Sequence, residues 1–260
     1  MSQYGKLAEI YDYLVAGIDY EEWADYMEQI LNKFNCPAKY IADLACGTGS
    51  TTIPLAERGY EVYGIDIAPA MLAKAVEKAK QKSVTPHFLE LDMRELTLPE
   101  PMDMITCYHD GLNYMLDAAD LKRVFTGVYD SLRPGGLFIF DLNAVEKLSD
   151  AGGDVTFVDD NDMSLIWETS YDKARDIWEI TLTGFLRQGE MYEKFVEVHR
   201  EKHFKSAEAL GILKDTGFEV LGIYHGFSFE PPRPNSRRIF YVARKPDSTR
   251  AFRENRRAKV

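Results

Sequence analysis

A short glycine-containing turn, Ala45-Cys46-Gly47-Thr48-Gly49, follows the apolar run at residues 40–44. Glycine lacks a Cβ and readily takes positive φ, so such a turn lets the backbone approach a ligand closely. Placed between a strand and a helix, it is typical of nucleotide sites. A dinucleotide fingerprint needs a third glycine, but Ser50 and Thr52 occupy the following positions. The pattern therefore disfavours a pyrophosphate site and a nicotinamide-dependent oxidoreductase.

Two carboxylates follow later apolar runs, where strands are expected to end. Asp66 comes directly after residues 61–65, and a carboxylate there can accept hydrogen bonds from both ribose hydroxyls. Asp92 comes after residues 87–91, where it is placed to accept from an adenine amino group, with the Met93 backbone as a donor to the ring. One aspartate alone is equally typical of a turn or cap. Two at successive strand ends predict a nucleoside site.

Alternating strands and helices are predicted around these residues. The expected strands are 40–44, 61–65, 87–91, 102–107, 137–140, 218–224 and 238–243, the fifth being introduced by the turn Arg133-Pro134-Gly135-Gly136. The expected helices are 51–58, 69–80, 121–132 and 206–216, after two N-terminal helices within residues 9–34. This order predicts an α/β fold with a doubly wound, mostly parallel, seven-stranded sheet that binds ligands at the carboxyl ends of its strands.

Between residues 150 and 203 the helical period disappears. Three stretches there, 164–172, 176–187 and 192–203, have the pattern of strands separated by polar turns. We therefore expect an antiparallel β insertion after the fifth strand. The predicted organisation is N-terminal helices and a ligand-binding core at 1–149, the insertion as a substrate lid at 150–203, the rest of the core at 204–245 and a basic tail at 246–260.

From about Tyr40 to Asn143 the chain resembles the class I S-adenosylmethionine-dependent methyltransferases, with their Rossmann-like sheet. The matching segments are Asp43–Gly49, Gly64–Leu72, Leu91–Met93 and Arg133–Gly136. In that family the glycine turn holds the methionine part of the cofactor, the second-strand acid its ribose and the third-strand acid its adenine. The resemblance implies S-adenosyl-L-methionine as cofactor, and as its contacts Asp43, Ala45, Cys46, Gly47, Thr48, Gly49, Asp66, Ile67, Met71, Asp92, Met93 and His109.

The segment after the fourth strand, residues 107–114, is where such enzymes place groups near the sulfonium and the methyl acceptor. His109 is the candidate base or acceptor-orienting group; the alternative is a hydrogen-bonded structural histidine. Asn113 and Tyr114 either orient an acceptor or begin a helix. The segment lacks the Asn-Pro-Pro-Tyr motif of some family members, which argues against methylation of adenine N6 or glutamine.

The N-terminal helices and the insertion resemble the small-molecule branch, which includes glycine and amino-sugar N-methyltransferases. There these elements cover the cofactor and shape the acceptor pocket. Tyr11 and Tyr20 are candidates for its methionine end, unless they are core tyrosines. His199 shares a predicted strand face with Phe195 and Glu197, so it either faces the pocket or is exposed. The predicted reaction is methyl transfer to N or O of a small-molecule acceptor.

Two alternative functions remain open, one because of the charge distribution and one because of the catalytic residues. The formal net charge of −11 disfavours nucleic acid as a partner. However, residues 244–260 carry seven basic and two acidic side chains, so an RNA methyltransferase using this tail with Arg233, Arg237 and Arg238 is one alternative. Another is a protein that binds S-adenosylmethionine without catalysis, because the sequence names no compelling catalytic residue.

The cysteine content and the hydropathy of the sequence indicate where in the cell this protein is expected. Three cysteines without paired or zinc-type spacing argue against disulfides and a structural metal, and favour a cytoplasmic protein. The sequence has no uncharged run of 18 residues and no apolar signal segment at its N-terminus. We therefore expect no association with a membrane.

Overall fold

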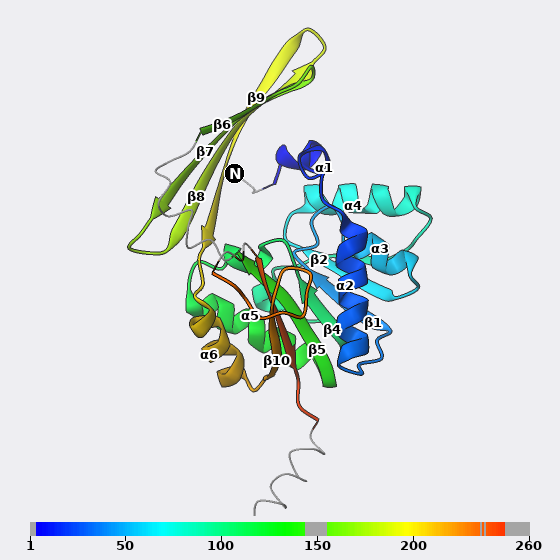
Figure 1. The fold of residues 1–260 in the computed structure, drawn as a ribbon. Helices are drawn as coiled ribbons and strands as arrows, with labels where there is room; N and C mark the ends of the chain where they lie inside the picture. The colour runs from blue at the N-terminus through cyan, green and yellow to red at the C-terminus, as the bar shows by residue number, and fades with distance from the viewer. Residues whose placement is uncertain (1–3, 144–154, 235, 237, 248–260) are drawn as a thin grey trace, which may run out of the picture.

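The computed structural model describes residues 4–143, 155–234, 236 and 238–247, and these form two sheets (Figure 1). The larger sheet has seven strands in the order β10-β11-β5-β4-β1-β2-β3, and the smaller has four in the order β6-β7-β8-β9. The strands of the larger sheet are β1 (Tyr40–Leu44), β2 (Glu61–Asp66), β3 (His87–Glu90), β4 (Met102–Cys107), β5 (Leu132–Asn143), β10 (Glu219–His225) and β11 (Arg238–Arg244).

The pairing of these strands confirms the predicted mostly parallel sheet. Strands β1 to β5 run parallel to one another, and β11 and β10 add antiparallel pairs beside β5 at one edge. The α-helices are α1 (Tyr11–Leu14), α2 (Tyr20–Lys33), α3 (Thr52–Glu57), α4 (Pro69–Gln81), α5 (Ala118–Ser131) and α6 (Ser206–Thr216). Three short 3₁₀ helices are η1 (Leu7–Glu9), η2 (Met93–Glu95) and η3 (Gly111–Tyr114).

Helices cover both faces of the larger sheet. Because side chains alternate along a strand, Ile41 of β1 packs into the cluster formed with α2, whereas Leu44 packs into the cluster formed with α5 and α6. All six residues of β4 are buried, as expected for a central strand covered on both sides. The carboxyl ends of β1, β2 and β4 therefore meet at one edge of the sheet, beside the turns predicted to bind the cofactor.

Strand β5 begins earlier than predicted. Residues 133–136, expected as a turn, lie within β5 and are paired to the end of β11: Gly135 N donates to Lys245 O at 2.8 Å, and Lys245 N donates to Gly136 O at 3.0 Å. Gly135 has φ +83°, and the pairing of β5 with β4 shifts register nearby. The local turn signal was overridden by hydrogen bonds to a segment far along the chain.

The insertion after β5 is an antiparallel sheet, as predicted. Its strands are β6 (Val155–Asp159), β7 (Met163–Asp172), β8 (Ile177–Gln188) and β9 (Met191–Lys202). The sequence did not predict β6, whose Val155 and Phe157 are exposed, so no buried face marked it. Residues 144–149 of the predicted core, 150–154 of the predicted insertion and 248–260 of the basic tail lie outside the described residues.

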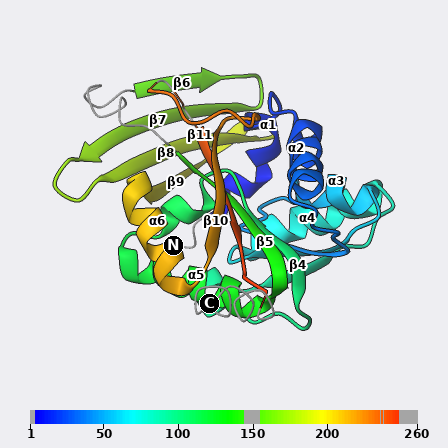
Figure 2. The same cartoon turned by 60° about the horizontal axis from the view of Figure 1, so that its bottom comes forward.

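The N-terminal segment lies between the two sheets (Figures 1 and 2). Leu7 packs with Leu165, Leu182 and Phe195 of the smaller sheet. On the other side, Ala8 packs with Met71 of α4. The segment thus bridges the insertion and the core, and it covers the edge where the strands end. Within the described residues, no helix is both long and apolar enough to cross a membrane.

Candidate functional site

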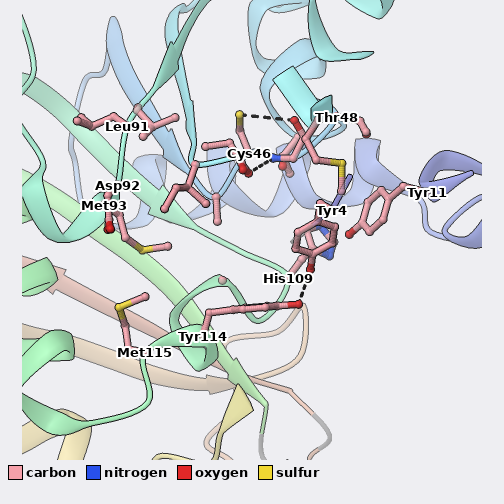
Figure 3. A pocket seen from close by; sticks show the side chains of 18 of the residues that line it. Tyr4, Tyr11, Cys46, Thr48, Leu91, Asp92, Met93, His109, Tyr114 and Met115 are labelled. Carbon is pink, nitrogen blue, oxygen red and sulfur yellow. Dashed lines mark hydrogen bonds between the residues drawn. The ribbon is translucent and has the colours of Figure 1, made fainter. Parts of the chain in front are cut away.

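A cavity of about 510 Å³ lies at the carboxyl ends of the parallel strands (Figure 3). This volume is typical of small-molecule sites. Its walls come from the N-terminal segment, from the turn after β1, from the ends of β2 and β3, from the η3 region and from β8 and β9. The lining residues are Tyr4, Tyr11, Tyr20, Ala45, Cys46, Gly47, Thr48, Ser50, Thr51, Ile65, Asp66, Ile67, Met71, Leu91, Asp92, Met93, Arg94, His109, Gly111, Tyr114, Met115, Leu116, Glu179, Val198 and Arg200.

The glycine turn presents its backbone to this cavity. Gly47 has φ +54°, and no atom lies within 4 Å of the position that its Cβ would take. Asp66 fixes the turn, because its Oδ2 accepts from Gly47 N and its Oδ1 from Ala68 N, both at 2.8 Å. Burial raises the pKa of the Asp66 carboxyl, although these backbone hydrogen bonds oppose the shift. The turn and the end of β2 therefore form one polar wall.

Asp43 and Gly49 lie beneath the turn and do not line the cavity. Asp43 is buried, and its carboxylate accepts from Thr52 Oγ1 at 2.7 Å and Thr106 Oγ1 at 2.9 Å. A Cβ on Gly49 would lie 3.2 Å from Ala75 Cβ, and Gly49 has φ +76°. The structure places these two residues, which the sequence predicts to contact the cofactor, behind the cavity wall, where they hold the turn against β4, α3 and α4.

The opposite end of the cavity is mainly apolar, with Leu91, Met93, Met115 and Leu116 in its wall. Asp92 lies at its margin and is engaged by Arg94, whose backbone N, Nε and Nη2 donate to the carboxylate at 2.6–3.0 Å. These hydrogen bonds lower the pKa of Asp92. An apolar slot beside an oriented carboxylate suits a flat heterocycle with a polar edge.

His109 lines the cavity in an unusual backbone conformation, with φ +56°. Its ring centroid lies 3.9 Å from that of Trp23 and 5.2 Å from that of Tyr20. Burial, together with the charge of Arg238, lowers the pKa of His109 to about 3. The imidazole is therefore neutral at physiological pH and a poor proton acceptor. Its Nε2 is buried without a hydrogen-bond partner among the described residues.

A second polar group joins η3 to the insertion. Tyr114 Oη bonds to Tyr4 Oη and lies 3.3 Å from His199 Nδ1 (Figure 3 shows the two tyrosines). His199 is 4% exposed, so the alternative of an exposed histidine is wrong. It faces Tyr114, a lining residue, rather than the cavity itself. Asn113 is buried and donates from Nδ2 to Lys202 O at 2.8 Å, so it fastens η3 to β9 and does not line the cavity.

Acidic side chains gather near these tyrosines. Asp110 and Asp141 share the guanidinium of Arg238, with Asp110 Oδ1 at 3.0 Å from Arg238 Nη1. Glu201 on β9 is half-buried, and no described residue donates a hydrogen bond to its carboxylate. Burial and the charge of Asp110 raise the pKa of Glu201 to about 7. The cluster therefore has more carboxylates than cations.

Comparison with known proteins identifies the family. The methyltransferase domain family matches residues 41–136. A putative methyltransferase of Bacillus subtilis (strain 168), YqeM, is 35% identical over 247 residues, which cover 93% of this chain and 97% of that protein. The solved S-adenosylmethionine-dependent methyltransferase from Clostridium acetobutylicum ATCC 824 is 31% identical, with a TM-score of 0.84 over 94% of this chain and 99% of that one.

The chain belongs to the class I S-adenosylmethionine-dependent methyltransferases. Its cofactor is S-adenosyl-L-methionine, which supplies an electrophilic methyl group on a sulfonium when bound. The site fits this molecule, because an open backbone turn, the carboxylate of Asp66 and an apolar slot follow one another along the cavity. The three carboxyl groups beside the cavity, which face one guanidinium, also suit a cationic sulfonium.

Most of the residues predicted to contact the cofactor lie together in the wall of this cavity. Those in the cavity wall are Tyr11, Tyr20, Ala45, Cys46, Gly47, Thr48, Asp66, Ile67, Met71, Asp92, Met93 and His109. Sequence reasoning missed Tyr4, Met115 and Glu201. Tyr4 precedes the helical period, and the other two carry no motif, so only the packing of the N-terminal segment and of η3 against β9 placed them near the site.

Proposed function

We propose that this methyltransferase acts on the amine nitrogen of a small molecule. The supporting observation is the cluster of Asp110, Asp141 and Glu201 beside the lining tyrosines, where Arg238 is the one cation that pairs with it among the described residues. When an amine attacks the methyl group, positive charge passes from sulfur to nitrogen. Carboxylates fixed near that nitrogen stabilise this charge, and they attract a cationic acceptor during binding.

The enclosure of the site supports a small acceptor. S-adenosylmethionine would take up much of the 510 Å³ cavity, whose wall includes Tyr4, Tyr11 and residues of β8 and β9. A small molecule, or one end of a larger molecule, fits the remaining space. We therefore assign the insertion, residues 150–203, the role of a substrate lid; residues 150–154 lie outside the described residues.

Within this proposal the cofactor-binding roles follow the cavity from end to end. The turn from Ala45 to Thr48 would hold the methionine part, with Tyr11 and Tyr20 beside it. Asp66 with Ile67 and Met71 would hold the ribose. Asp92 and Met93 would hold the adenine, and His109, which lines the cavity, would orient the acceptor.

Relatives named for N-methylation support an amine. A cypemycin N-terminal methyltransferase of Streptomyces sp. is 26% identical over 206 residues. A dTDP-4-amino-2,3,4,6-tetradeoxy-D-glucose N,N-dimethyltransferase of Saccharopolyspora spinosa is 29% identical over 136 residues. Part of the basic surface expected for an RNA methyltransferase is not free to bind phosphate, because the Arg238 guanidinium pairs with Asp110 and Asp141. Arg237 and residues 248–260 lie outside the described residues.

The proposal is tested by following a labelled methyl group. Calorimetry first measures binding of S-adenosylhomocysteine; then transfer from S-adenosylmethionine is screened against amino acids, amino sugars and short peptides, each beside its hydroxyl analogue. We expect transfer to amines. Glu201→Gln should raise the KM for the amine roughly tenfold or more and leave binding of S-adenosylhomocysteine unchanged. Glu190→Gln, at an exposed position in the turn between β8 and β9, is the matched control. Transfer to hydroxyl analogues alone, or to RNA alone, contradicts the proposal.

A further inference from the structure

We infer that Tyr114, His199 and Glu197 form a relay that accepts the proton of the methyl acceptor. The three side chains come from η3 and β9 and follow one another inward from the cavity wall. Tyr114 lines the cavity, and its hydroxyl lies 3.3 Å from His199 Nδ1. Among the described residues His199 Nε2 has no hydrogen-bond partner, but it lies 3.3 Å from Glu197 Oε2, which would form an ion pair with the ring once it is protonated. Phenol, imidazole and carboxylate in this order resemble the nucleophile, base and orienting acid of a catalytic triad.

The arrangement around His199 favours a relay over simple packing. A histidine with only a structural role on this strand would need neither a buried carboxylate near one ring nitrogen nor a cavity-lining hydroxyl near the other. Here His199 and Glu197 are 4% and 8% exposed, and the Tyr4 ring lies 4.7 Å from the imidazole. Burying a carboxylate is costly unless it is compensated. Glu197 is compensated by Tyr4 N at 2.8 Å and Leu7 N at 3.1 Å, which hold it behind the imidazole.

The charges that face His199 come from each element packed against it. The N-terminal segment contributes Tyr4, η3 contributes Tyr114, and β9 contributes Glu197 and Glu201. The β8 residue opposite His199 is the apolar Ile180. This set holds two phenols and two carboxylates, and the nearest carboxylate oxygen, Glu197 Oε2, lies 3.3 Å from His199 Nε2.

The other groups in the wall are poor proton acceptors. Burial raises the pKa of Tyr4 and of Tyr114 above the ordinary tyrosine value, so each phenol keeps its proton unless another group accepts it. His109 has a pKa of about 3. The His199 imidazole, whose Nδ1 lies 3.3 Å from the Tyr114 hydroxyl, is therefore the base to which this cavity-lining tyrosine connects.

The proposed step balances in protons and electrons. The lone pair of the acceptor nitrogen forms the bond to the methyl carbon, and the electron pair of the broken C–S bond stays on sulfur. A proton on the acceptor passes to Tyr114 Oη, while the Tyr114 proton passes to His199 Nδ1. The imidazolium later releases its proton to solvent. The relay rests on the proposed function only in requiring an acceptor that carries a proton, which an amine or a hydroxyl supplies.

One test needs no methyl acceptor. Nitrogen-labelled histidine in the full-length protein, saturated with S-adenosylhomocysteine, reports which ring nitrogen of His199 carries the proton. We expect the Nε2–H form, with Nδ1 free to accept from Tyr114. Tyr114→Phe should shift the Nδ1 resonance, and Glu197→Gln should disturb Nε2. Glu193→Gln, on the same strand face but paired with Lys6, should change neither. A proton on Nδ1 in the neutral ring overturns the inference.

A second test uses the reaction with any acceptor found active in the screen. His199→Gln and Tyr114→Phe should each lower kcat at least tenfold near pH 7, with activity recovering as pH rises and the acceptor deprotonates without help. Tyr192→Phe, exposed on the same strand, is the control. A change in KM alone, with an unaltered pH profile, overturns the relay while leaving the proposed function intact. Absence of transfer to every acceptor contradicts the proposed function, and the nitrogen spectra still decide the relay.

Discussion

Lys78 Nζ on α4 lies 2.9 Å from Asp12 Oδ1 on α1, so an ion pair fastens the N-terminal segment to the core. The same ammonium donates to Thr48 Oγ1 at 3.1 Å, and Thr48 Oγ1 in turn donates to Asp12 Oδ1 at 2.5 Å. Because Thr48 lies in the glycine turn, closure of the N-terminal segment and the shape of the cofactor site are connected through three side chains.

Replacing Lys78 by methionine should weaken cofactor binding. The variant keeps the aliphatic stem but loses the ion pair, so the N-terminal segment is held less firmly over the cavity. We expect the Kd for S-adenosylhomocysteine to rise roughly fivefold to thirtyfold, the effect of about 1–2 kcal/mol. Calorimetry measures this change. Lys80→Met, at an exposed position of the same helix, is the control; equal effects in both variants would show that the ion pair does not hold the segment.

Asp66→Ala should lose affinity at the ribose end of the cavity. The substitution removes the acceptor for Gly47 N and Ala68 N as well as the proposed partner of the ribose hydroxyls. We expect a loss of roughly 1–3 kcal/mol in the free energy of binding S-adenosylhomocysteine. Glu61→Ala changes an exposed carboxylate at the other end of β2 and should have no effect. Unchanged affinity in Asp66→Ala would falsify the assignment of this residue.

The buried carboxyl of Asp43 should make stability depend on pH. Burial raises its pKa to about 6, so between pH 4 and 6 the folded state holds a proton that the unfolded state has released. Stability from this group is therefore present at low pH and lost as pH rises through 6. Relative to Asp43→Asn, the wild type should lose up to about 3 kcal/mol in the free energy of unfolding between pH 4 and 7. Urea titrations at each pH measure it, with the exposed Asp130→Asn as control.

His109 should remain neutral across the physiological range. With a folded pKa of about 3 and an unfolded value of about 6.5, its ring resonances should not titrate between pH 5 and 8 in the native protein, but should do so in urea. The sign follows: below pH 6.5 the unfolded state binds the proton more readily, so acid destabilises the wild type relative to His109→Gln. A native titration midpoint near neutrality would restore His109 as a candidate base.

The sequence by itself determined the strands, helices and glycine turn of the core, because short-range patterns encode them. The bounds predicted for β1, β4 and α6 agree with the structure, and the turn with Asp66 and Asp92 lies at strand ends as expected. This part is predictable because strand period, helix caps and glycine turns are short-range, and the parallel order brings successive strand ends to one edge.

The tertiary structure alone decided which side chains of the N-terminal segment, η3 and β9 come together. Tyr4 meets Glu197 across 193 residues, and Tyr114 meets His199 across 85. No local pattern encodes these pairs, because they depend on how the smaller sheet and the N-terminal segment pack over the strand ends. Contacts within the core likewise join residues far apart in the chain, because His109 packs against Trp23 of α2 and Asp43 accepts a hydrogen bond from Thr106 of β4. Residue type and spacing predicted most of the cavity wall, whereas long-range contacts determine which polar side chains of η3 and β9 meet beside it.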